Sequence, residues 1–176
     1  MISEEQYIEH TRRWIRDVVI GLNFCPFAAK PVSEQRVRYR VETSSAIRVC
    51  LEAVEQECIY LDQHEETETT LLIMPHAMPV FADYLDYIAL VDKRIRKLDY
   101  EGIYQAATFH PEYCFDGEPA DDASNYTNRS PYPMLHLLRE DSLEKAISHY
   151  PDVDSIPERN IRLTRQKGEE YMRLLR

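Results

Sequence analysis

The chain has 176 residues, of which 44% are hydrophobic and 30% are charged, a composition typical of a globular protein. Acidic residues outnumber basic ones by 31 to 21, and the resulting formal net charge of −10 disfavours nucleic acid as a partner. The polar start of the chain and the lack of an apolar run of about 18 residues argue against an export signal and a membrane helix, so we expect a cytoplasmic protein that does not associate with membranes.

The hydrophobic pattern predicts helices and strands that alternate along the chain. A capping box from Ser3 to Gln6 predicts a helix that continues to about Asn23. Two prolines indicate an ordered loop over residues 24–35. Strict alternation over residues 36–42 predicts a strand with one buried face.

A second helix is expected after residues 43–45, where small apolar residues recur at helical spacing. The continuous apolar run over residues 69–74 predicts a strand that is buried on both faces. Pro79 begins a third helix, and residues 102–109 are predicted to form a third strand.

The remaining elements are a strand over residues 134–139, a short helix from Asp141 that stops at Pro151, and a last helix capped at Ser155. This order predicts a single α/β domain spanning residues 1–176. We expect its helices to pack on a mixed, mostly parallel four-stranded sheet with one long ordered loop.

That loop, residues 110–133, joins the third and fourth strands and shows neither helical nor strand periodicity. Loops of this length are usually functional or disordered, and the aromatic content of this one argues for order. Because ligands of open α/β sheets gather at the carboxyl ends of strands, we expect the loop to form the working surface.

Two histidines follow predicted strands, and a third lies within one. His110 begins the loop, and His76 follows the second strand, so the two share one edge of the sheet if these strands are parallel. His110 either moves a proton in a reaction or closes its strand by bonding to the backbone. His136 is either a core histidine or meets His110 beneath the loop, as an acid/base pair or as two ligands of a transition metal.

Arg129 follows several acids in the loop, whose spacing does not match a calcium-binding loop. Arg129 is either a bidentate clamp for a carboxylate or phosphate, or the internal counter-ion of these acids. Asn125 and Asn128 either orient a substrate or form turns. Tyr113 and Ser130 complete the candidate substrate-binding set.

Cys25 lies just past the first helix. It is either a small buried hydrophobe or a nucleophile paired with His110 or His136. The four cysteines form no CxxC pair and no metal-ligand spacing, so we expect reduced thiols.

Several strings resemble those of a widespread bacterial family known only as a domain of unknown function. They are Asn23-Phe-Cys-Pro-Phe-Ala28, Phe109-His-Pro-Glu-Tyr-Cys-Phe115, Asn125-Tyr-Thr-Asn-Arg-Ser-Pro-Tyr-Pro-Met-Leu-His-Leu-Leu-Arg-Glu-Asp141 and Ile156-Pro-Glu-Arg-Asn160. The resemblance implies one intact bacterial domain, and it implies no activity, cofactor or catalytic residue.

Three hypotheses remain open. The first is an enzyme that acts on a small anionic metabolite at the loop, with His110, His136 and Cys25 as catalytic residues and Arg129 as the anion-binding residue. The second is a non-catalytic module that binds a metabolite or a partner protein, with His110 and Arg129 held in structural bonds. The third is a metal site built from His110, His136 and a loop carboxylate, with Cys25 as a further ligand. The sequence indicates neither a particular cofactor nor an oligomeric state.

Overall fold

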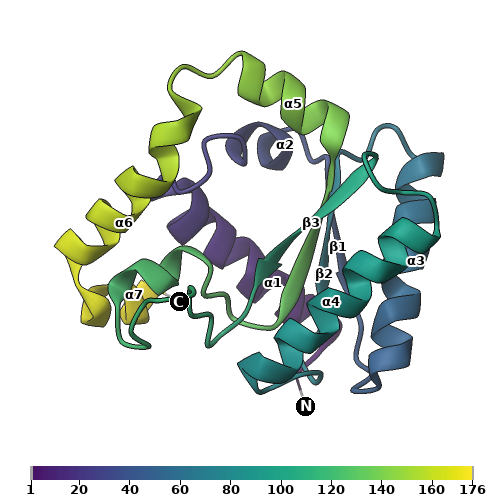
Figure 1. Cartoon of the computed structure of the whole chain (residues 1–176), viewed down its shortest axis with the longest axis horizontal. Helices are drawn as coiled ribbons and strands as arrows, with labels where there is room; N and C mark the ends of the chain where they lie inside the picture. The colour runs from purple at the N-terminus through teal and green to yellow at the C-terminus, as the bar shows by residue number, and fades with distance from the viewer. Residues whose placement is uncertain (1, 176) are drawn as a thin grey trace.

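The structure, a computed structural model, describes residues 2–175 and contains a four-stranded sheet with helices on both faces (Figure 1). The strands are β1 (Val37–Val41), β2 (Thr69–Ile73), β3 (Tyr104–Phe109) and β4 (Met134–Arg139). The α-helices are α1 (Glu4–Trp14), α2 (Ala29–Ser33), α3 (Ile47–Gln63), α4 (Phe81–Lys97), α5 (Glu140–Ser148), α6 (Ile156–Lys167) and α7 (Glu169–Leu175). Shorter elements are the π-helical segment η1 (Ile15–Ile20) and the 3₁₀ turns η2 (Ala123–Thr127) and η3 (Val153–Ser155). Among the helices of residues 2–175, none is both long and apolar enough to cross a membrane.

The strand order is β1-β2-β4-β3, and β1–β2 is the parallel pair. β4 lies between β2 and β3 and is antiparallel to both, so the prediction of a mostly parallel sheet is wrong. The path of residues 110–133 gives the reason. This loop leaves the carboxyl end of β3 and returns to that same end, where Phe109 pairs with Met134. If β4 were parallel to β3, the connection would have to cross to the opposite end of the strands before β4 begins.

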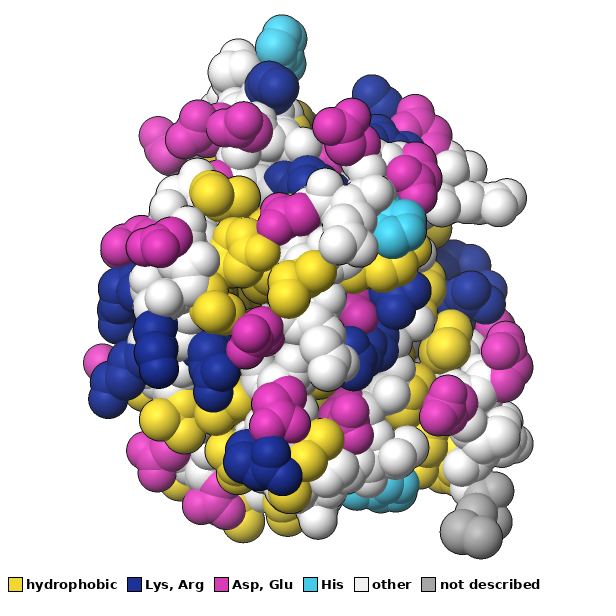
Figure 2. All heavy atoms as spheres, turned by 90° about the vertical axis from the view of Figure 1, so that its right-hand side faces the viewer, with side chains coloured by type: hydrophobic (Ala, Val, Ile, Leu, Met, Phe, Trp, Pro, Cys, Tyr) yellow, Lys and Arg dark blue, Asp and Glu magenta, His cyan; other side chains and the backbone are white. Residues whose placement is uncertain are grey.

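Helices α3 and α4 cover one face of the sheet, where they bury Leu72, Leu135 and Leu137. The hydroxyl of Tyr84, a fully buried residue of α4, donates a hydrogen bond of 2.6 Å to the Met134 carbonyl. Its polar end is therefore satisfied inside the core. On the outer side of these helices, acidic and basic side chains are intermixed (Figure 2).

Strand β1 places its apolar residues and its arginines on opposite faces as predicted, but all five of its residues are only half-buried, so neither face is fully buried. Its apolar residues face α1, and its two arginines face α3. Arg38 Nε lies 2.8 Å from the carboxylate of Glu57, and Arg40 Nη1 lies 3.0 Å from it. Glu57 is only 1% exposed, whereas both arginines remain partly in solvent, so the cluster ties the edge strand to α3 through a buried carboxylate.

The opposite face of the sheet packs against α1 and η1, with the ring of Trp14 5.2 Å from that of Phe109. The capping box that begins α1 is present, with Ser3 and Gln6 bonded reciprocally. The helix predicted to reach Asn23 is α1 followed by the π-helical η1 and a turn. The segment predicted to be a loop over residues 24–35 contains the short helix α2.

Candidate functional site

The loop over residues 110–133 packs on α6 and α7 through η2. The fully buried Asn125 accepts a hydrogen bond from the Phe115 backbone N–H (2.9 Å) and donates one to the Pro119 carbonyl (2.8 Å). Asn128 donates to a backbone carbonyl of β3 (3.0 Å). These bonds join segments 6 to 20 residues apart, so both asparagines tie the loop together over a longer range than the turn-forming alternative describes.

Arg129 is bound to the backbone of its own loop. Its Nε donates to the Tyr113 carbonyl at 3.0 Å and its Nη2 to the Ala120 carbonyl at 2.6 Å, and its guanidinium lies 4.6 Å from the Tyr126 ring centre. The ion pairs with the loop acids are made by Arg165 of α6, which lies far along the sequence and was not predicted. These acids are Glu118 at 2.8 Å and Asp122 at 3.1 Å, and the bond from Arg165 lowers the pKa of Asp122 to about 2.

The other two candidate binding residues of the loop also have partners within the protein. The Ser130 hydroxyl donates to the Tyr132 carbonyl at 2.6 Å, and the Tyr113 hydroxyl lies 3.4 Å from the Thr108 hydroxyl. The loop therefore uses its polar side chains to hold its own fold.

His110 is fully buried on the α4 side of the sheet, with its ring 5.3 Å from Phe81 and 5.1 Å from Tyr84. Its Nε2 lies 3.0 Å from the Met78 carbonyl, and its Nδ1 accepts from the Glu112 backbone N–H at 3.0 Å. This pair of bonds fits the tautomer that carries its proton on Nε2. His110 thus has the backbone-bonding geometry that the structural alternative requires.

His136 lies on the opposite face of the sheet. It pairs in register with Leu71 and Ala107, and its ring lines a cavity there. The structure therefore does not bring His136 and His110 together. Within residues 2–175, no group of three His, Cys, Asp or Glu side chains is arranged to hold a metal ion.

The cavity that His136 lines has a volume of about 650 Å³ and lies over the edge of the sheet where β1 and β2 begin. Residues of the sheet, of α2 and of α5 line it. Most of the lining is apolar, including Trp14, Ile15, Val19, Leu71, Ala107, Phe109, Leu138, Leu143 and Ala146. Cys25 lines the same cavity, so two of the three predicted catalytic residues share one site.

Two titratable groups of the cavity lining, His136 and Cys25, have pKa values that are shifted by burial. Burial lowers the pKa of His136 to about 4, so its ring is neutral at pH 7. Burial also raises the pKa of the Cys25 thiol, against the opposing effect of backbone hydrogen bonds from Phe27 and Ala28. Within residues 2–175, His136 Nε2 and Trp14 Nε1 are buried ring nitrogens without a hydrogen-bond partner.

Sequence reasoning missed this cavity because its lining comes from segments far apart in the chain. The segment before α2 meets the turn after α5 through a ring contact of 5.4 Å between the ring centres of Phe27 and Tyr150. The sequence pattern that could have indicated the cavity is the apolar stripe of α5, in which Leu143 and Ala146 recur at helical spacing. Both residues are only half-buried in the fold.

Comparison with known proteins identifies the family of the chain but assigns it no activity. A search of the curated proteins and a search of the solved structures each found no match to the chain. A family model described as "Protein of unknown function (DUF1415)" matches residues 6–174. The chain therefore belongs to the DUF1415 family of proteins of unknown function.

Proposed function

We propose that the protein is a non-catalytic module that binds a small molecule with a large apolar body in the cavity between the sheet, α2 and α5. The observation that carries this proposal is the cavity of about 650 Å³, lined mainly by apolar side chains and by His136. Ligand pockets in proteins have volumes of roughly 300–1,000 Å³ and combine an apolar lining with a few polar groups.

The unpartnered ring nitrogens of His136 and Trp14 support the proposal. A buried polar group without a partner costs about 1–3 kcal/mol, and such groups are uncommon in folded proteins. A ligand that carries one hydrogen-bonding group beside its apolar body offers the His136 imidazole a partner that the surrounding protein does not supply.

The shared cavity of Cys25 and His136 is the one observation that favours an enzyme with a thiol nucleophile. The electrostatics oppose that alternative. A reactive cysteine needs a lowered pKa, and burial shifts the Cys25 pKa upward. His110 and Arg129, the proton-transfer and anion-binding residues of the enzyme hypothesis, are engaged in bonds within the protein, as the binding-module hypothesis expects.

The test is a fluorescence titration with N-phenyl-1-naphthylamine, a neutral apolar probe that brightens when it leaves water. We expect saturable binding together with a change in the emission of Trp14, the single tryptophan of the chain, because Trp14 lines the cavity. Filling the cavity with Ala146→Phe on α5 should abolish binding. Ala82→Phe, the same change at an exposed position of α4, should leave it intact. If the probe does not bind to the wild type, or binds equally to both variants, the proposal is wrong.

A further inference from the structure

Cationic side chains gather at the mouth of this cavity, although the chain carries a formal net charge of −10. Four cations and two carboxylates are among the lining residues: Lys30, Arg36, Arg139 and Lys145, with Glu34 and Glu68. Resting on the function proposed above, we propose that the ligand is an amphipathic anion. Its apolar body would lie over the sheet, and its anionic head would lie at the mouth between Lys30 and Lys145.

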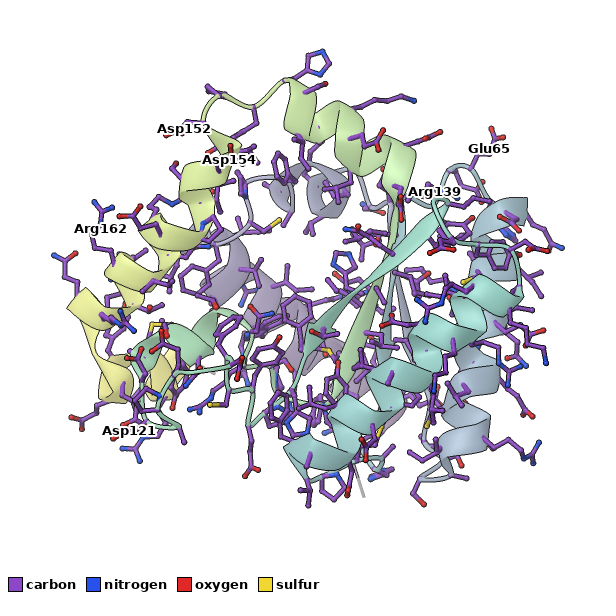
Figure 3. All side chains as sticks on the ribbon, viewed as in Figure 1. Glu65, Asp121, Arg139, Asp152, Asp154 and Arg162 are labelled. Carbon is purple, nitrogen blue, oxygen red and sulfur yellow. The ribbon has the colours of Figure 1, made fainter. Side chains whose placement is uncertain are left out.

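The two arginines of the lining are already committed to the protein. Arg36 lies 2.9 Å from Glu68 and 3.8 Å from Glu34, so it forms ion pairs with both carboxylates of the lining. Arg139 lies at the end of β4, where α5 begins (Figure 3). Its guanidinium donates to three backbone carbonyls, those of Leu61, His64 and Thr67.

The two lysines differ from the arginines in this respect. Lys30 on α2 and Lys145 on α5 are exposed, so they mark the part of the lining that meets solvent. Neither ammonium forms an ion pair with a carboxylate among residues 2–175. The acids of the turn after α5, Asp152 and Asp154, lie on the outer side of the fold (Figure 3) and do not line the cavity.

This distribution matches one class of ligand. The floor around Leu71, Ala107 and Phe109 offers apolar contact, and the exposed end offers two ammonium groups without carboxylate partners. A neutral apolar molecule would leave these charges unused, and a cationic amphiphile would be repelled by them. Each exposed charge contributes modestly, so we expect a loss of about two- to fivefold in affinity for each lysine removed.

The test compares two probes that share one ring system, neutral N-phenyl-1-naphthylamine and anionic 8-anilinonaphthalene-1-sulfonate. In buffer of low ionic strength, Lys30→Gln/Lys145→Gln should weaken binding of the anionic probe by about four- to 25-fold and leave the neutral probe unchanged. The matched control is Lys93→Gln/Lys97→Gln, which removes the same charge from exposed positions of α4 outside the cavity. Dodecanoate should displace the neutral probe from the wild type, and should do so less well from the Lys30/Lys145 variant.

The possible outcomes separate this inference from the proposed function. Suppose that the neutral probe binds to the wild type. If the two double variants then lose the same affinity for the anionic probe, or neither loses any, the proposal of an anionic head group is refuted. The proposal of an apolar binding site still stands in that case. If the neutral probe does not bind to the wild type, the cavity is not a binding site and both proposals fail. Charge reversal by Lys30→Glu/Lys145→Glu should enlarge the loss, which an indirect structural effect of the glutamine variants would not predict.

Discussion

Replacing His136 by leucine should remove most of a pH-dependent loss of stability between pH 7 and pH 4. Burial lowers the pKa of this ring to about 4, whereas a histidine of the unfolded chain titrates near its ordinary pKa of 6.5. Between these two values the unfolded chain takes up a proton that the folded protein does not. Folding therefore becomes less favourable as the pH falls through this window.

The size of the effect follows from the two pKa values. Linkage gives a loss of about 2 kcal/mol in the free energy of unfolding between pH 7 and pH 5, and about 3 kcal/mol once the pH is below the pKa of the folded state. His136→Leu keeps an apolar side chain of similar size in the cavity lining and has no group that titrates. Urea denaturation of both proteins at pH 7 and pH 5 measures the difference.

The comparison needs a control because many carboxylates also titrate on the acid side. His149→Gln removes an exposed histidine of the cavity lining and should retain the pH dependence of the wild type. If His136→Leu loses as much stability as the wild type between pH 7 and pH 5, the ring is not desolvated as the structure implies. An NMR titration that places the pKa of His136 above about 6 would refute the reasoning directly.

Three further predictions concern the loop, the sheet edge and the thiol. Arg129→Ala should cost about 1–3 kcal/mol and lower the melting temperature by about 2–12 °C, because it removes two bonds to loop carbonyls. Arg162→Ala, at an exposed position of α6, should melt within about a degree of the wild type. Glu57→Ala should cost about 1–3 kcal/mol in urea denaturation, because it removes the buried carboxylate that two partly exposed arginines share. A loss no larger than that of Glu52→Ala, which removes an exposed ion pair of the same helix, would contradict this. Alkylation of Cys25 by iodoacetamide at pH 7 should be slower than that of a free cysteine because its thiol stays protonated, and a faster reaction would revive the nucleophile hypothesis.

The capping box at Ser3, the alternating strand β1 and the fully buried strand β2 follow from the sequence, because each depends on neighbours a few residues away. The direction of β4 does not follow from such patterns. An apolar run looks the same for a parallel and an antiparallel strand. Whether β4 is parallel or antiparallel depends on the end of the strands to which the 24-residue connection returns.

The candidate site divides in the same way. The sequence identified the residue types able to do chemistry, and it left open whether His110 and Arg129 serve a ligand or the fold. That choice depends on where backbone carbonyls lie in space, and both side chains are hydrogen-bonded to carbonyls of residues far from them in the chain. The cavity of His136 and Cys25 was beyond the reach of the sequence for a related reason. A cavity is the space left between segments after packing, and local patterns determine which faces of those segments are apolar without determining how closely the faces meet.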